Sequence, residues 1–251
     1  RATTALPRNM IFLFTFAKVQ IIFHLKAKKM HKAGFINIIG FSNVGKSTLL
    51  NALIGEKLVI VTPKVQTTRH RILGIYNDED TQIVFSDTPG YIETPFYALH
   101  KKMNDTVLNV FEDADALMFI TEPDVKDFGV LGDTIKKQNK PLFIFVNKAD
   151  LSSVDKLQSY SEWLVSEFNS QHVYIISALH KFNTDRIIPL LKTILPEHPP
   201  YFPKDDISDR NLRFFIAEMI REQLFLLYKK EIPYSSEVLI EQYKETENLT
   251  I

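Results

Sequence analysis

The sequence has 251 residues, of which 45% are hydrophobic, so it is long enough to form one full domain with a buried core and a smaller unit beside it. It contains no cysteine, which excludes disulfides, a disulfide-linked partner, a thiolate metal site and a cysteine nucleophile. Its 30 Lys and Arg balance its 30 Asp and Glu, so the chain as a whole carries no net charge that would attract nucleic acid.

Residues 1–29 are basic and carry no acidic side chain, and Lys18, Gln20 and His24 interrupt an apolar stretch over 10–25. This stretch is too short and too broken to span a bilayer, and the segment lacks a signal-peptide cleavage pattern. Three interpretations stay open: an upstream extension without a function, an organelle-targeting segment, or a membrane-contacting segment. We predict that residues 1–29 are a non-native or targeting extension and that the first domain occupies residues 30–195.

A buried strand is predicted over 35–39 and a helix over 46–54, with a glycine-containing loop between them. The loop and the start of the helix read Gly40, Phe41, Ser42, Asn43, Val44, Gly45, Lys46, Ser47 and Thr48. This order is that of a P-loop, in which backbone N–H groups and the helix dipole bind a pyrophosphate. We predict that Lys46 contacts the β- and γ-phosphates and that Ser47 ligates Mg2+, the alternative being a turn without a ligand.

Two further strands are predicted over 70–76 and 81–86. The turn between them is short and polar, so the two strands should pair antiparallel at one edge of an otherwise parallel sheet. The loop before the first of these strands reads Gln66-Thr67-Thr68-Arg69-His70. A threonine here, Thr68, is predicted to close over Mg2+ when a γ-phosphate is present.

The segment Asp87-Thr88-Pro89-Gly90 follows the second of these strands, and Tyr91 comes next. Such a D-x-x-G sequence is common by chance, so its weight comes from its position at a strand end. There Asp87 is predicted to hold Mg2+ and the Gly90 N–H to contact the γ-phosphate.

The segment Asn147-Lys148-Ala149-Asp150 follows a predicted buried strand over 141–146, at the end of the strand where open α/β sheets bind ligands. A carboxylate only accepts hydrogen bonds, so Asp150 suits guanine, which offers two donors from N1–H and its 2-amino group. Asn147 is predicted to brace the loop or the base, and the Lys148 stem to lie over the purine. As an alternative, the tetrad is a helix-initiating turn.

The remaining elements complete an α/β order. Strands are predicted over 115–120 and 172–176, and helices over 97–110, 128–138, 154–168 and 181–193. Ser177-Ala178 follows the last strand, where a backbone N–H could meet the guanine O6. We therefore predict an α/β P-loop GTPase with a mostly parallel six-stranded sheet and helices on both faces.

Four prolines mark a stiff linker over 196–207, and a different pattern follows it. Ser208 or Asp209 is predicted to cap a helix that runs to about Tyr228, and the alternation over 237–243 predicts one strand.

In order, the segments 40–47, 66–70, 87–90, 147–150 and 177–178 resemble the five motifs of translation-factor-class GTPases, and 66–70 is similar to the switch I signature of the Era family. The residues Asp209-Arg210, Arg213-Phe214, Ala217-Glu218, Ile220-Arg221-Glu222 and 231–235 resemble the linker and opening of the Era KH domain. The resemblance covers about residues 30–251. Residues 208–251 are then expected to be the N-terminal part of a KH-type RNA-binding domain, truncated at this point.

The resemblance implies a GTPase that uses GTP, GDP and Mg2+ and assists maturation of the small ribosomal subunit. Its expected partners are 16S rRNA and the 30S subunit, and its expected location is the cytoplasm, with peripheral contact at the inner face of the cytoplasmic membrane. The alternative function is a guanine-nucleotide-dependent module that docks on RNA or membrane with negligible turnover.

The sequence departs from the family in two places. Phe41-Ser42 stand where the family usually has Asn-Pro, which is expected to leave the phosphate loop intact. No glycine follows Gly132, so the G-x-x-G loop by which KH domains clamp RNA is missing. Residues 204–251 also hold seven Lys and Arg against ten Asp and Glu. RNA binding by this chain is therefore expected to be weak.

Catalysis is predicted to involve Lys46, Thr68 and Gly90 at the reacting phosphate. Tyr91 stands where Ras has a water-orienting glutamine, and it is expected to pack in the loop instead. The family pattern implies K+ near Asn43. His70, His100 and His180 are expected to be surface or loop residues and not general bases.

Overall fold

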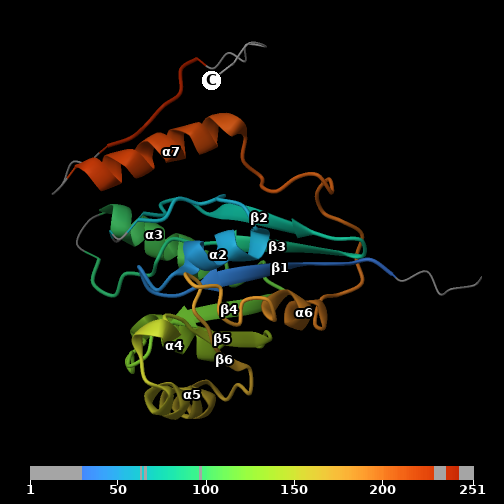
Figure 1. Cartoon of the computed structure of the whole chain (residues 1–251), viewed down its shortest axis with the longest axis vertical. Helices are drawn as coiled ribbons and strands as arrows, with labels where there is room; N and C mark the ends of the chain where they lie inside the picture. Colours follow the sequence, from blue (N-terminus) through green and yellow to red (C-terminus); the bar gives the residue numbers. More distant parts are fainter. Residues whose placement is uncertain (1–29, 63, 65–66, 96–97, 229–235, 243–251) are drawn as a thin grey trace, which may run out of the picture.

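The computed structural model describes residues 30–62, 64, 67–95, 98–228 and 236–242. They contain one six-stranded sheet in the order β2-β3-β1-β4-β5-β6 (Figure 1). The strands are β1 (Lys32–Ile39), β2 (Ile72–Asn77), β3 (Thr81–Asp87), β4 (Ala116–Thr121), β5 (Leu142–Val146) and β6 (Val173–Ile175). β2 is antiparallel to β3, and every other neighbouring pair is parallel. The predicted P-loop GTPase fold, with an antiparallel pair at one edge, is confirmed.

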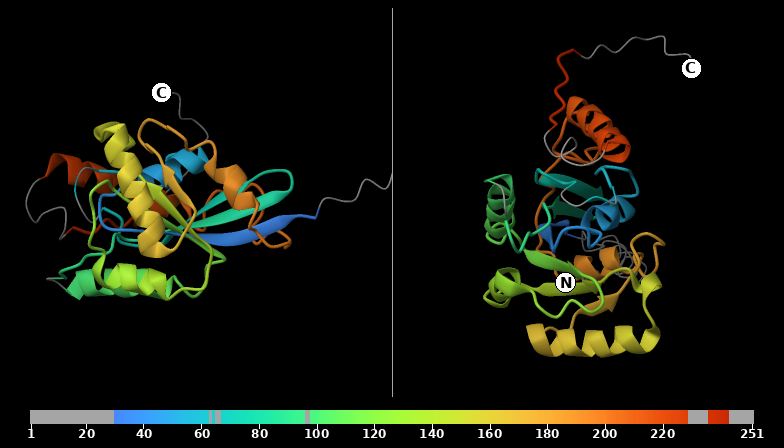
Figure 2. Two further views of the ribbon diagram at one scale, coloured as in Figure 1. Left: turned by 90° about the horizontal axis from the view of Figure 1, so that it is seen from below. Right: turned by 90° about the vertical axis from the view of Figure 1, so that its left-hand side faces the viewer.

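Helices cover both faces of the sheet, as Figure 2 shows. They are α2 (Lys46–Ile54), α3 (Ala98–Asn109), α4 (Gly129–Lys136), α5 (Val154–Phe168), α6 (Ile187–Lys192) and α7 (Leu212–Leu227), with a short 3-10 helix, η1 (Ala149–Leu151). Apolar side chains of α2 and α6 share one core cluster, whereas those of α3, α4 and α5 share the other. The sheet therefore separates two apolar layers.

The central strands are buried on both faces, which explains why they read as continuous apolar runs. In β5, Phe143 and Phe145 belong to the α2 and α6 side, while Ile144 and Val146 belong to the opposite side. Successive side chains of a strand point to opposite faces, so each face needs its own apolar residues. Because β1, β3, β4, β5 and β6 run parallel, the loops that follow these strands lie at one edge of the sheet.

The segment between α6 and α7 packs along the β2–β3 edge of the sheet. Gln82, which is fully buried in β3, accepts hydrogen bonds from the backbone N–H groups of Tyr201 (2.7 Å) and Phe202 (3.0 Å). Further along, Ile75 N donates to Ile207 O at 2.9 Å. This path brings α7 beside β2, at the opposite end of the sheet from α5 (Figure 1).

The predicted helix over 181–193 is wrong at its start, because α6 begins at Ile187. Lys181 and Asn183 have φ values of 53° and 59°, in the left-handed region that no helix uses. Phe182 instead exchanges backbone hydrogen bonds with Ser177 at 3.0 and 3.2 Å. A tight turn thus follows β6 where a helix was expected.

The expected cap of α7 is also wrong. The cap is Asn211, whose side chain accepts from Phe214 N at 3.1 Å. Ser208 donates to Leu73 O (2.7 Å) and Asp209 accepts from Leu73 N (3.1 Å), so both candidates are committed to the edge of β2.

The described residues 236–242 form no strand, contrary to the prediction for 237–243. An alternating sequence needs a neighbouring strand to supply its hydrogen bonds, and no described strand pairs with this segment. The predicted extension over 1–29, the residue Gln66, the segment 231–235 and Tyr243 lie outside the described residues.

Candidate functional site

The P-loop connects β1 to α2 and curls tightly. Gly40 and Gly45 have φ values of 153° and 97°, and Asn43 has a φ of 64°. A Cβ added at Gly45 would lie 2.2 Å from Asn147 Nδ2, so no larger residue fits there. Val44 is buried in the core, which anchors the middle of the loop. The positive φ values and the buried Val44 together fix the course of the backbone into α2.

Lys46, the first residue of α2, lies across this loop. Its Nζ donates to Phe41 O at 2.8 Å and to Gly40 O at 3.2 Å, and only 5% of the residue is exposed. Burial lowers the pKa of Lys46 to about 8, and the charge of Asp87 acts in the opposite direction. The ammonium group is thus poorly solvated and gains if an anion enters the pocket.

Three predicted metal ligands lie together next to this lysine. Ser47 Oγ donates to Asp87 Oδ2 at 2.6 Å and lies 3.0 Å from Thr68 Oγ1. Burial raises the pKa of the Asp87 carboxyl from 3.8 to about 6, opposed by the charge of Lys46 and the Ser47 hydrogen bond. Among the described residues, none forms a hydrogen bond with the buried Asp87 Oδ1. The site therefore contains a carboxylate oxygen that lacks a protein partner.

The 87–90 segment reaches the P-loop at Gly90. A Cβ added at Gly90 would lie 2.4 Å from Ser42 Cα, so the two backbones touch. Thr88, which is buried, donates from Oγ1 to Ile38 O at 2.8 Å, and Pro89 is buried beside it. Thr88 thus braces the segment against β1, and the nucleotide contacts predicted for Thr88 and Pro89 stay predictions.

Tyr91 packs in the core, as expected. It is 7% exposed, its N–H donates to Gly40 O at 3.1 Å, and its ring lies 6.1 Å from that of Phe41. Phe41 in turn stacks on Phe128 at 6.3 Å. The phenol is therefore not among the groups that face the phosphate pocket.

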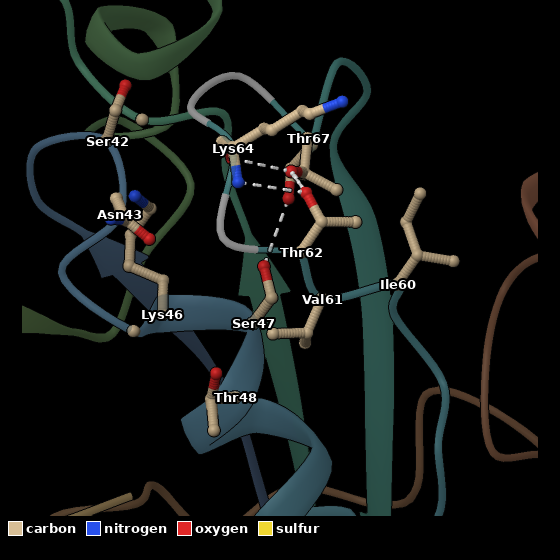
Figure 3. Close-up of a pocket in the computed structure, with 13 residues that line it drawn as sticks. Ser42, Asn43, Lys46, Ser47, Thr48, Ile60, Val61, Thr62, Lys64 and Thr67 are labelled. Carbon is tan, nitrogen blue, oxygen red and sulfur yellow. Dashed lines mark hydrogen bonds between the residues drawn. The ribbon is translucent and has the colours of Figure 1, made fainter. Parts of the chain in front are cut away.

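A pocket opens between these segments (Figure 3). Side chains of Ser47, Thr62 and Thr67 point toward its interior, with Asn43 and Lys46 on another side. Its lining residues are Ser42, Asn43, Gly45, Lys46, Ser47, Thr48, Ile60, Val61, Thr62, Lys64, Thr67, Thr68 and Gly90. Five of these lining residues were not predicted from the sequence as site residues: Ile60, Val61, Thr62, Lys64 and Thr67. Their sole signal was their place upstream of Thr68 in the same loop.

Asn147 links this pocket to the segments predicted to bind the base. It is 3% exposed; its Nδ2 donates to Val44 O at 2.8 Å and its Oδ1 accepts from Ala178 N at 2.9 Å. Of the two predicted roles, the structure shows Asn147 bracing the loop. The Ala178 N–H, expected near the guanine O6, is bonded to Asn147 in this structure.

Asp150 lies in η1 beside Ser177, at the same edge of the sheet. Ser177 Oγ donates to Asp150 Oδ1 at 2.6 Å, and this hydrogen bond is the main reason that the pKa of Asp150 is lowered. Asp150 is thus ionised at neutral pH, as an acceptor for guanine requires. His180 Nε2 lies 3.7 Å from Asp150 Oδ2, so His180 belongs to this site, which the sequence did not indicate.

Lys148 is held in a strained conformation with a φ of 61°. Its Nζ forms a 2.6 Å ion pair with Glu122, which follows β4 and was not predicted as a site residue. The pair joins the loops that follow the neighbouring strands β4 and β5.

The remaining two histidines lie apart from the pocket lining. His70 is exposed, as expected. His100 was expected at the surface, but it is buried in α3 and 6% exposed. Two lysines, Lys101 and Lys102, follow His100 directly in α3, and this polar stretch concealed that its imidazole is buried.

Comparison with known proteins gives consistent matches. A family described as "50S ribosome-binding GTPase" matches residues 35–148. The chain is 41% identical over 224 residues to GTPase Era of Geotalea daltonii, covering 86% of this chain and 73% of that protein. It is 40% identical to GTPase Era of Clostridium botulinum strain Eklund 17B, covering 88% and 76%.

Two solved structures are similar in fold and sequence. A variant of Aquifex aeolicus Era bound to GDP·AlF4− matches with a TM-score of 0.76 and 35% identity, over 81% of this chain and 70% of that one. Era in complex with MgGDPNP and nucleotides 1506–1542 of 16S ribosomal RNA matches with a TM-score of 0.77 and 35% identity, over 82% and 70%.

Proposed function

Because this chain belongs to the Era family of GTPases, we propose that it acts in maturation of the small ribosomal subunit, with 16S rRNA and the 30S subunit as its partners. The chain is a GTP-hydrolysing enzyme that binds guanine nucleotides. The ribosomal role is supported by the relative that was solved with a segment of 16S rRNA. A cytoplasmic location, with peripheral contact at the inner face of the cytoplasmic membrane, is part of the same proposal.

The observation that carries the nucleotide site is the double hydrogen bond of Asn147. It ties the carbonyl of Val44 in the P-loop to the N–H of Ala178 beside Asp150, so the phosphate and base ends are parts of one rigid arrangement. On this basis, residues 40–48 and 87–91 form the phosphate end of the proposed site, to which Tyr91 contributes through its backbone beside Gly40 and not through its phenol. Asn147, Lys148, Asp150, Ser177 and Ala178 form its base end.

The residues present fit Mg2+. This ion prefers oxygen ligands, and the unpartnered Asp87 Oδ1 lies in a cluster with the hydroxyls of Ser47 and Thr68. We therefore assign Asp87, Ser47 and Thr68 as the residues that would hold it. When bound, Mg2+ would neutralise charge on the phosphate oxygens, while Lys46 and the Gly90 N–H supply further positive charge from the protein.

Asp87→Asn is expected to raise the free energy of unfolding of the protein without nucleotide or metal at pH 7.5 by about 1–3 kcal/mol. The pKa of Asp87 rises on folding from 3.8 to about 6, so between these values the folded state holds an extra proton and stability falls as pH rises. The gain should therefore vanish near pH 4. Urea unfolding of both proteins in EDTA at the two pH values measures it, and a gain over wild type that is no larger at pH 7.5 than at pH 4 contradicts it.

The proposed domain boundaries follow the same family assignment. Residues 30–195 form the GTPase domain, 196–207 the linker and 208–251 part of a KH-type RNA-binding domain. Residues 204–251 have no glycine for a G-x-x-G clamp and carry three more acidic than basic residues, ten against seven. We propose that they contribute little RNA affinity by themselves. None of the helices within the described part of the chain is long and apolar enough to cross a membrane.

The ribosomal role is tested in the source cells by depleting the protein and supplying either the wild type or Lys46→Ala. Depletion should lower small subunits relative to large ones and cause a precursor of 16S rRNA to accumulate, and only the wild type should restore both. Turnover of GTP by the purified chain, with Lys46→Ala as control, separately measures catalysis. Normal subunit ratios on depletion would refute the ribosomal role and leave the GTPase activity unaffected.

A K+ ion near Asn43 is proposed to replace part of the charge that an arginine finger supplies in other GTPases. Asn43 lines the phosphate pocket and is exposed to it. GTP hydrolysis should then be faster in KCl than in NaCl at equal ionic strength. Asn43→Gly should remove most of this difference, because glycine keeps the backbone with its φ of 64° unstrained while deleting the amide. Equal rates in both salts would return Asn43 to a loop-bracing role.

A further inference from the structure

The helix α7 contacts the loop that carries Thr68. Arg221 Nη2 donates to Thr67 O at 2.7 Å, and Arg221 is only 4% exposed. Glu218, one turn earlier in α7, accepts from Arg221 Nε at 2.8 Å and from Nη2 at 2.5 Å. Paired and buried in this way, the guanidinium has little freedom to move.

Further contacts attach α7 along the same loop. Glu222 is 5% exposed, forms a 2.6 Å ion pair with Lys57 and accepts from Val61 N at 3.3 Å. The Lys64 ammonium donates to the carbonyls of Phe225 and Tyr228, at the end of α7. Among the described residues, the helix therefore contacts this loop at Lys57, Val61, Lys64 and Thr67.

Three of the loop residues that α7 contacts also line the pocket. These residues are Val61, Lys64 and Thr67, so α7 contacts the segment that forms one side of the phosphate pocket. The carbonyl that Arg221 binds belongs to the planar peptide that joins Thr67 to Thr68. Holding that carbonyl fixes the orientation of the whole peptide unit. The nitrogen of this peptide unit belongs to Thr68, whose hydroxyl lies 3.0 Å from Ser47 Oγ.

We infer that Arg221, held by Glu218, is a positioning residue that keeps Thr68 at the metal-binding cluster, so that α7 raises the affinity of the site for Mg2+ with a triphosphate. The inference rests on the proposed Mg2+ site of Ser47, Thr68 and Asp87. A ligand that prefers the arrangement with Thr68 in place binds more tightly when α7 already stabilises it. By reciprocity, the same ligand stabilises the docking of α7.

The test compares wild type with the double variant Glu218→Gln/Arg221→Met, which leaves no unpaired buried charge. Arg213→Met is the matched control, because Arg213 is an exposed arginine of the same helix. The measurements are the Kd of a non-hydrolysable GTP analogue with Mg2+ and the Kd of GDP in EDTA. The double variant should bind the analogue about tenfold more weakly, a loss of about 1.4 kcal/mol, and GDP in EDTA within about twofold of wild type.

Hydrogen exchange supplies a second readout. The analogue with Mg2+ should slow exchange of α7 backbone amides in the wild type and not in the double variant. Arg221→Lys, which keeps the charge without the two-pronged pairing, should fall between the two in analogue affinity.

The outcomes separate the two ideas. If Mg2+ does not tighten analogue binding in the wild type, the proposed Mg2+ site is refuted, and so is the inference that rests on it. If Mg2+ tightens binding equally in wild type and double variant, the metal site stands and the role of Arg221 is refuted. An equal loss for the analogue and for GDP in EDTA also refutes it, because such a loss is not specific to Thr68 or the metal.

Discussion

Asp150→Asn is expected to weaken GDP binding by about 1.5–3 kcal/mol, roughly 10- to 150-fold, and to create binding of xanthosine diphosphate. The lowered pKa of Asp150 keeps its carboxylate ionised, so it accepts from both donors of the guanine edge. In the variant, the amide oxygen can still accept from Ser177 Oγ, as Asp150 Oδ1 does at 2.6 Å. The amide N–H then faces the base, where it suits the carbonyl that xanthine has in place of the 2-amino group.

The measurement is the Kd of both nucleotides by calorimetry. Asp155→Asn is the matched control, since Asp155 is an exposed aspartate at the start of α5 and its replacement should leave both constants unchanged. Because the Asp150 side chain is partly exposed and lies in the short helix η1, its replacement should hardly change the free energy of unfolding without nucleotide. Unchanged GDP affinity would remove Asp150 from the base-binding site.

Asn147→Ala is expected to lower the free energy of unfolding by about 2–5 kcal/mol and to weaken GDP binding at least about 100-fold. The amide of Asn147 is almost fully buried and satisfies both Val44 O and Ala178 N. Alanine would leave that carbonyl and that N–H buried without a partner. The P-loop and the loop after β6 would also lose the link that aligns the phosphate and base ends.

Urea unfolding and GDP calorimetry check this prediction, with Asn139→Ala as the control because Asn139 is an exposed asparagine between α4 and β5. Asn147→Asp is an informative companion, because a carboxylate accepts from Ala178 N but has no donor for the Val44 carbonyl. This variant should lose nearly as much stability and GDP affinity as Asn147→Ala. Wild-type GDP affinity in Asn147→Ala would show that the link does not align the two ends.

Several features were predictable because their causes are local in sequence. The two-sided burial of β3, β4 and β5 produces apolar runs, and the start of α2 immediately after Gly45 is visible in the P-loop itself. The short polar turn between β2 and β3 required an antiparallel pair, and Asn77 pairs with Gln82 as such a turn demands. Asp87 and Asp150 stand at strand ends, so their place at one edge of the sheet followed from the parallel order.

The errors lie where distant partners compete for the same groups. Ser208 and Asp209 are good capping residues, but the edge of β2 uses both, and Asn211 caps α7 instead. The alternation over 237–242 has the period of a strand and no neighbouring strand among the described residues to pair with. His100 looked like a surface residue until packing placed it inside.

The sequence by itself determined the class of fold, the phosphate loop and the identity of the residues at the strand ends, because glycine geometry, apolar periodicity and carboxylate chemistry act over a few neighbouring residues. Only the tertiary structure decided what those residues touch. It assigned Asn147 to the link between two loops and left Asp87 Oδ1 without a hydrogen-bond partner in the described part of the chain. It also placed Arg221 of α7 on the carbonyl of Thr67, 154 residues away in the chain. Such contacts depend on how separate elements pack, and no local pattern in the sequence encodes them.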